Sequence, residues 1–146
     1  MSATLILYRV DADASPSDSV TAVVGDPLTL GQSWDLLQTV LAGDQSGWTG
    51  RTDAELAIVG GRTTPTTAGG MLISIDDVQV RRAAAHLAQS SFSELVTRHR
   101  RALESACGGD VEQIVNEDLL PRFEELRSFY RAAAEARNAV VKRLSG

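Results

Sequence analysis

The sequence predicts an α/β (α+β) fold, a small sheet covered by helices, and three observations support this class. Residues 4–10 and 139–144 are both rich in β-forming side chains. Between them, segments with helical apolar spacing and capping residues alternate with short apolar runs. The 146 residues are 43% hydrophobic and 23% charged, which indicates a single domain over residues 1–146 that buries a core.

The first segment predicts one strand and one short helix. Residues 4–10 are nearly continuously apolar, which is typical of an inner strand. The run from Ser15 to Asp18 then offers a capping serine, a proline for the first helical turn and an acidic residue. The helix that follows is expected to end at Gly25.

The helix expected over residues 33–43 is the segment around which the rest of the core is predicted to form. Trp34, Leu37 and Leu41 share one face of this helix, so that face is expected to be buried. Ser33 can cap its first turn, and Gly43 can adopt the left-handed conformation that ends it.

Two loops and an ambiguous segment follow. Residues 44–52 form a polar loop that contains Trp48, and residues 62–70, rich in threonine, proline and glycine, form a candidate mobile loop. Between these loops, residues 53–61 fit either a short helix or a buried strand, because periodicity cannot decide over so few residues.

The next segment predicts a strand and two helices. Residues 71–73 form the strand, after which Ser74 caps a helix that continues to about residue 89. Ser91 begins another helix, which carries His99 on its apolar stripe and ends at Gly108.

The last segment predicts the longest helix and a closing strand. Residues 110–115 fit either a helical turn or an extended piece. Asn116 can cap a helix over residues 117–136, and Asn138 suits its exit. Residues 139–144 then form the final strand.

Composition excludes several classes of function. The net charge of −5 disfavours nucleic-acid binding. No segment has the length of a membrane span or the features of a signal peptide, so we expect no membrane attachment and a cytoplasmic location. The single cysteine, Cys107, excludes an internal disulfide and a multi-cysteine zinc site. Of the fourteen cationic residues all but Lys142 are arginine, a bias that indicates a high-GC bacterial coding preference.

The reactive side chains form no recognisable catalytic or metal-binding motif. His99 has the position of a packed histidine, and His86 has no acid or cysteine at ligand spacing, so no metal site is expected. Cys107 follows a helix C-terminus, where the macrodipole does not activate a thiolate. The glycine pairs at residues 60–61 and 69–70 do not fit a phosphate loop or a dinucleotide fingerprint, so no cofactor is expected.

Trp48, Arg51 and Arg62 are the candidate binding residues. A tryptophan in a polar loop is either a plug folded into the core or an exposed anchor for a partner, and we favour the plug. Arg62 supplies an anion-binding group if the loops of residues 44–70 form a pocket.

The order of several short motifs resembles the YfbM-like family of bacterial proteins, a domain of unknown function. Gln38 departs from this pattern because a histidine is expected there, and Gly108-Gly109-Asp110 replaces an expected Tyr-Pro segment. The resemblance implies a three-layer α-β-α sandwich with a small mixed sheet, and it implies no activity. The residues that carry it are Tyr8, Trp34 to Leu37, Leu41 to Gly43, Leu56 to Gly61, Leu72 to Val78, Phe123, Leu126, Phe129, Tyr130, Ala133 and Ala134.

These observations favour a non-enzymatic bacterial protein that binds a partner protein or a small ligand, in an accessory or immunity-like role. The alternative is a small enzyme whose anion-binding pocket is formed by the loops of residues 44–70. A deep pocket that holds Arg62 beside two titratable groups would favour the enzyme, whereas a flat surface with an exposed aromatic patch would favour the binding protein.

Overall fold

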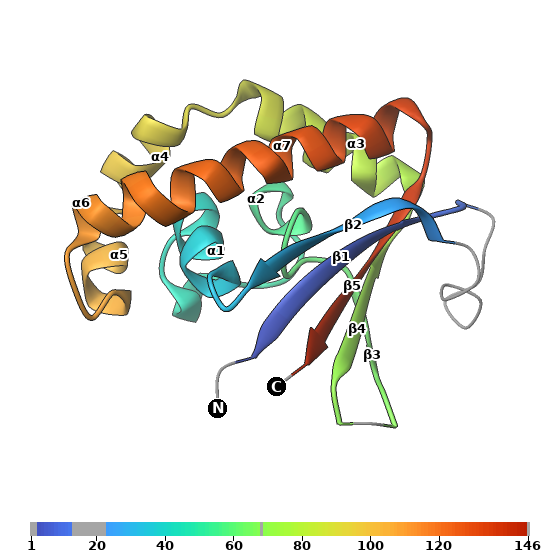
Figure 1. Ribbon diagram of the computed structural model, residues 1–146, viewed down its shortest axis with the longest axis horizontal. Coiled ribbons are helices and arrows are strands. Elements are labelled where there is room, and N and C mark those ends of the chain that lie inside the picture. The colour runs from blue at the N-terminus through green and yellow to red at the C-terminus, as the bar shows by residue number, and fades with distance from the viewer. Residues whose placement is uncertain (1–2, 13–22, 68, 146) are drawn as a thin grey trace.

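A computed structural model describes residues 3–12, 23–67 and 69–145 (Figure 1). The described strands form one five-stranded sheet in the order β2-β1-β5-β4-β3, and every pair of neighbours is antiparallel. The strands are β1 (Thr4–Val10), β2 (Val23–Gly31), β3 (Arg62–Pro65), β4 (Met71–Ile75) and β5 (Ala139–Ser145).

The α+β class is confirmed, and the sheet differs from the expectation in two details. The resemblance implied a mixed sheet, but the described strands pair only in the antiparallel sense. It also implied three layers, but the described helices lie on one face of the sheet, which gives two layers (Figure 1). The first difference follows from connectivity, because β1 pairs with β2 and β3 with β4 without the helical crossover that parallel strands need.

Strands β1 and β5 pair with each other at the centre of the sheet. They are in register over their whole length, with Thr4 opposite Ser145. Leu5 and Leu7 are buried under the helices, whereas Thr4, Ile6 and Tyr8 are only partly buried. This alternation is expected for an antiparallel sheet that is covered on one face. Both strands lie where the sequence predicted them.

The two edge strands occupy segments for which the sequence predicted other structures. Strand β2 includes Val23 and Val24, which the sequence placed on a helix ending at Gly25; the rest of that helix lies outside the described residues. Strand β3 occupies part of the predicted mobile loop. Pro27 and Pro65 are tolerated in these strands because an edge strand has an unpaired side.

Helix α1 (Trp34–Ala42) is confirmed, but its beginning is held differently from the prediction. Ser33 makes no side-chain capping bond, and its hydroxyl instead donates to the Asp118 carboxylate (2.5 Å). Trp34 is half-buried rather than fully buried, and its indole N–H donates to the Ala3 carbonyl (3.0 Å). The rest of the predicted apolar face is buried.

The first of the next two helices decides between the two alternatives for residues 53–61, and the second starts later than predicted. Residues 53–61 begin with a short helix, α2 (Asp53–Leu56), rather than a strand. Helix α3 (Asp77–Gln89) starts later than predicted because β4 continues to Ile75. Asp76 therefore replaces Ser74 as the cap and exchanges hydrogen bonds with Gln79 in a capping box.

The helix predicted to carry His99 is divided at that residue. Helix α4 (Phe92–Arg98) ends there and helix α5 (Arg100–Ala106) begins. The backbone of His99 has φ −107° and ψ 22°, outside the helical region, so the two helices are separate.

A long helical segment leads into β5. It joins α6 (Val111–Ile114), a π-helical turn (Val115–Leu119) and α7 (Leu120–Glu135), so the predicted cap Asn116 lies inside the π-helical turn. Arg137, not Asn138, takes the left-handed conformation after α7, with φ 57°. Of the described helices, none combines the length and apolar character that a membrane span requires.

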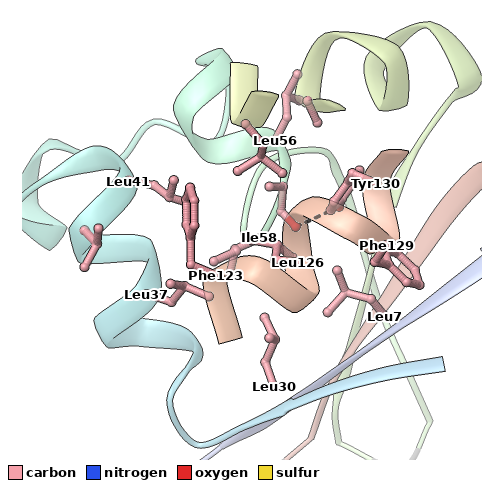
Figure 2. Close-up of a cluster of buried hydrophobic side chains, with 14 of the residues drawn as sticks. Leu7, Leu30, Leu37, Leu41, Leu56, Ile58, Phe123, Leu126, Phe129 and Tyr130 are labelled. Carbon is pink, nitrogen blue, oxygen red and sulfur yellow. Dashed lines mark hydrogen bonds between the residues drawn. The ribbon is translucent and has the colours of Figure 1, made fainter. Parts of the chain in front are cut away.

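The core fills the space between the helices and the covered face of the sheet (Figure 2). Phe123 of α7 lies against Leu37 and Leu41 of α1, and its ring centroid is 5.1 Å from that of Phe92. Phe123, Leu37 and Leu41 are almost completely buried, so α1 and α7 both contribute side chains to this core.

Candidate functional site

The candidate site lies where α1 ends at Gly43. The Gly43 N–H donates to the Thr39 carbonyl (2.8 Å), and its φ of 85° confirms the predicted positive-φ end of this helix. His99 adds a second constraint, because a Cβ atom at residue 43 would lie 3.1 Å from the histidine Cδ2. Both the positive φ and the close approach of the ring therefore favour glycine at this position.

His99 is held by the end of the same helix. Its Nδ1 lies 2.7 Å from the Val40 carbonyl oxygen, and because a carbonyl only accepts, Nδ1 carries a proton. The other nitrogen, Nε2, has no hydrogen-bond partner among the described residues and is not sealed in the interior. The ring is thus fixed at one nitrogen and available at the other.

A solvent-open cavity of about 690 Å³ adjoins His99. It is lined by Gly43 and Asp44 at the end of α1 and by most of residues 97–105 from α4 and α5. Small-molecule sites have volumes of roughly 300–1,000 Å³, so this cavity has room for a small ligand.

Trp48 is bonded to the same glycine. Its indole N–H donates to the Gly43 carbonyl (2.9 Å), and the side chain is half-buried outside the main core cluster. Asp44 begins a short 3-10 turn (Gln45–Gly47) and accepts from the Ser46 N–H (2.9 Å). Trp48 is therefore intermediate between the predicted plug and the predicted anchor, and it braces this loop against the end of α1.

Arg51 and Arg62 are brought near each other by their neighbours in the chain. The Gly61 N–H donates to the Gly50 carbonyl (3.2 Å), which joins the loop before α2 to the start of β3. Both arginine side chains are exposed, and neither lines the cavity beside His99. Of the three predicted binding residues, Trp48 is the one that bonds to the wall of this cavity.

A buried carboxylate holds the loop that carries Arg51. Glu55 is 1% exposed and accepts hydrogen bonds from the Gly50 N–H (2.5 Å) and from the Thr52 (2.7 Å) and Thr49 (3.2 Å) hydroxyls. Burial alone would raise the pKa of Glu55, but these hydrogen bonds outweigh it and hold the pKa below its ordinary value. The carboxylate is thereby committed to the fold.

The one lysine of the chain lies beneath the same segment. Lys142 is fully buried, and its Nζ donates to the carbonyls of Leu56 (2.5 Å) and Gly60 (2.7 Å). Burial holds the pKa of Lys142 well below its ordinary value. Lys142 was not among the predicted site residues, although the sequence contains a signal. A single lysine among arginines, within an apolar strand, indicates a place for a compact ammonium or amine rather than a planar guanidinium.

Two further buried side chains form hydrogen bonds to the backbone of residues 54–59. Gln38 donates to the Ala54 carbonyl (3.3 Å) and accepts from the Val59 N–H (3.2 Å). The Tyr130 hydroxyl donates to the Ala57 carbonyl (2.7 Å; Figure 2), and burial raises its pKa well above the ordinary value, so it remains a neutral donor. We refer to Gln38, Glu55, Tyr130 and Lys142 as the buried polar cluster.

The described residues offer little for metal or thiol chemistry. Among them, no group of three or more His, Cys, Asp or Glu side chains is placed to hold a metal ion. Cys107 is half-buried, and burial together with the negative charge of Asp35 raises the pKa of its thiol. A raised pKa disfavours the thiolate, in agreement with the inert role that the sequence predicted.

A second cavity, of about 640 Å³, is lined by residues of α4 and of the segment from α6 to α7. The arginines on its wall are paired with carboxylates, Arg100 with Glu112 and Arg127 with Glu124 (3.7 Å). Because these charges are already paired, the cavity beside His99 is the better candidate for a binding site.

Similarity to known proteins assigns the chain to a family. Residues 6–142 match DUF1877, described as a domain of unknown function. The chain belongs to the DUF1877 family. The crystal structure of a protein of unknown function, YfbM from Escherichia coli, is similar to this DUF1877 domain with a TM-score of 0.71 and 14% sequence identity. The similarity covers 97% of this chain and 99% of that chain, and at this identity it shows the fold alone. No curated protein matches the chain.

The resemblance to the YfbM-like family is therefore confirmed, and the structure explains two of its motifs in this DUF1877 domain. The motif that ends at Gly43 is the end of α1, which positions His99 and Trp48. Gln38, where the resemblance expects a histidine, is a buried bridge between two backbone groups of residues 54–59. That departure belongs to the buried polar cluster and not to the cavity wall.

Proposed function

We propose that this DUF1877 domain is a non-enzymatic binding protein whose ligand site is the cavity beside His99. The observation that carries the proposal is the histidine ring, which is fixed by the Val40 carbonyl at Nδ1 while Nε2 stays free. A side chain held in place before the ligand arrives loses little conformational entropy on binding, which favours affinity. We also propose, from composition and family, that the domain acts in the bacterial cytoplasm in an accessory or immunity-like role.

The buried polar cluster supports binding over catalysis. Perturbed pKa values often mark active sites, and Glu55 and Lys142 both have them. Each of these groups, however, is buried and bonded to the protein, Glu55 to a loop and Lys142 to two carbonyls. Arg62, which the enzymatic alternative needs in a deep pocket, is exposed on the edge strand β3.

One observation favours an enzyme of a different kind, centred on His99 and not on the loops of residues 44–70. A histidine with Nδ1–H bonded to a carbonyl and Nε2 free has the arrangement of a general base. In this alternative the arginines beside His99 would bind an anionic substrate. Turnover of any member of a panel of phosphate and carboxylate esters that disappears in His99→Asn would support the enzyme.

Nitrogen-15 NMR titration with neutral, cationic and anionic small molecules tests the binding proposal. Compounds that bind the cavity are expected to shift the signals of Gly43, the His99 ring and the Trp48 indole N–H, which are linked by direct contacts. The variant His99→Asn keeps a donor for the Val40 carbonyl and lacks Nε2, so it should fold normally and bind more weakly. If no compound of any charge shifts these signals, the proposed function is wrong.

A further inference from the structure

The lining of the cavity beside His99 has one more cationic than anionic side chain, whereas the whole chain is acidic. The chain has a net charge of −5, whereas residues 98–101 read Arg-His-Arg-Arg, and all four line the cavity. Two carboxylates also line it, Asp44 and Glu104. Whether the cavity favours an anionic ligand therefore depends on which of these charged side chains already form ion pairs within the protein.

Glu104 and Arg100 are already paired with each other, whereas Asp44 is hydrogen-bonded to Ser46 and keeps its negative charge. Asp44 accepts hydrogen bonds from the N–H (2.9 Å) and the hydroxyl (2.8 Å) of Ser46, which lower its pKa. Glu104 pairs with Arg100 (3.4 Å), and Arg100 also contacts Glu112. Arg100 is therefore neutralised by two carboxylates and has little charge left for a ligand.

Arg98 and Arg101 remain available. Neither forms an ion pair within the part of the chain that the structure describes, and both side chains are exposed. Two arginines without a described ion pair and His99, whose Nε2 has no described partner, therefore line one cavity.

We propose that this cavity binds the oxyanion group of a small molecule, a carboxylate or a phosphate, through Arg98, Arg101 and His99. The inference rests on the proposed function and adds the chemical class of the ligand. A guanidinium group donates two parallel N–H bonds to an oxyanion, and such charge-assisted bonds are stronger than neutral ones. When the His99 ring is protonated, Nε2 donates to the oxyanion while Nδ1–H stays bonded to the Val40 carbonyl.

Titration with three defined probes tests the ligand class. Inorganic phosphate, succinate and its neutral diamide, succinamide, are added to the full chain at constant ionic strength, and binding is followed by the NMR signals of Gly43 and His99. Phosphate or succinate should shift these signals in a saturable way, and succinamide should not. The first two probes distinguish a phosphate from a carboxylate ligand.

Charge variants identify the residues. Arg98→Gln and Arg101→Gln are each expected to weaken binding about tenfold or more, the loss typical of a charge-assisted hydrogen bond. Arg143→Gln removes the same charge from an exposed position on β5, outside the cavity, and should leave affinity within about twofold of the original. His99→Gln, whose amide reaches toward the Nε2 position, should bind more tightly than His99→Asn.

The outcomes separate the two proposals. If succinamide binds as well as succinate, or if Arg143→Gln weakens binding as much as Arg98→Gln and Arg101→Gln, the oxyanion inference is overturned while the binding function stands. If no probe and no other compound binds the cavity, both are overturned. Saturable binding of an anion that depends on Arg98 and Arg101, but not on Arg143, supports both.

Discussion

The polar side chains of the buried polar cluster are bonded and buried, whereas several of those at the cavity beside His99 are open to solvent and have no described partner. In the cluster, each of Gln38, Glu55, Tyr130 and Lys142 bonds to backbone groups of residues 50–60 and is shielded from solvent. At the cavity, two arginines and the histidine Nε2 border solvent without a described partner. The perturbed pKa values of Glu55, Tyr130 and Lys142 accompany bonds that hold the fold, so these values do not by themselves mark the candidate site.

Replacement of Lys142 should have the largest effect on stability. Lys142→Ala leaves the carbonyls of Leu56 and Gly60 without their donor and opens a cavity, so the free energy of unfolding should fall by about 4 kcal/mol. Lys142→Met retains most of the volume and should lose about 2 kcal/mol. Urea denaturation measures both changes. A Met variant as stable as the original would show that the two hydrogen bonds do not stabilise the fold.

The same lysine predicts a dependence of stability on pH. Because its pKa is lowered by folding, the unfolded chain binds more protons between that lowered value and about 10.4, the ordinary value for lysine. The stability advantage over Lys142→Met should therefore increase as the pH rises through this range. Urea denaturation of both proteins at about pH 7 and about pH 9 measures it. A difference that stays constant would contradict the prediction.

Glu55→Gln should have a smaller effect of the same pH sense, in a more acidic range. An amide cannot accept all the hydrogen bonds of the carboxylate, so we expect a loss of about 1–2 kcal/mol at neutral pH. The folded-state pKa of Glu55 is lowered, so this contribution is present above about pH 4.3 and is lost as the pH falls through the folded-state value. The difference in the free energy of unfolding between the two proteins should be present at neutral pH and should disappear at acidic pH. A difference that persists in acid would show that the charge of Glu55 does not stabilise the fold.

Gly43→Ala tests the link between the fold and the cavity. The positive φ and the 3.1 Å approach to His99 should together destabilise the variant by about 1–2 kcal/mol and displace the ring. Gly108→Ala is the matched control, because a Cβ atom there meets nothing within 4 Å. Thermal unfolding and the His99 NMR signals report the two effects, and equal behaviour of the two variants would show that Gly43 imposes no special constraint.

The smallest effect is expected at the cavity arginines. Arg98→Gln and Arg101→Gln remove exposed side chains that form no described ion pair, so stability should change by less than about 0.5 kcal/mol. Urea denaturation measures this change on the same samples used for ligand binding. A large decrease in the free energy of unfolding would show that these arginines stabilise the fold.

The elements predicted correctly are those whose signal is local. The strands over residues 4–10 and 139–144 and the helix α1 follow from continuous apolar runs or helical spacing. The edge strand β3 was missed because its pairing with β4, and not its own composition, makes it a strand. The break at His99 was missed for a similar reason, since the ring is bonded to Val40, which lies 59 residues away.

The candidate site was predicted only in part. Trp48 was identified from its unusual place in a polar loop, and it does bond to Gly43 at the cavity wall. Arg98 and Arg101 were overlooked because one arginine resembles another until the ion pairs are known. Lys142 was overlooked because burial of a strand residue depends on the segment that packs above it, here residues 56–60.

The pairing of β1 with β5 places the start of the first strand beside the end of the last strand. Thr4 lies opposite Ser145, and neighbouring strands are separated by about 4.8 Å, so a few residues suffice to connect them. If a linker joined these two strand ends, the chain could be cut at another loop, and the same elements would follow one another in a permuted order. The exposed glycines at 108 and 109, between α5 and α6, offer a place for this cut that interrupts no helix or strand. A circular permutant opened there would retain both the sheet and the junction at His99.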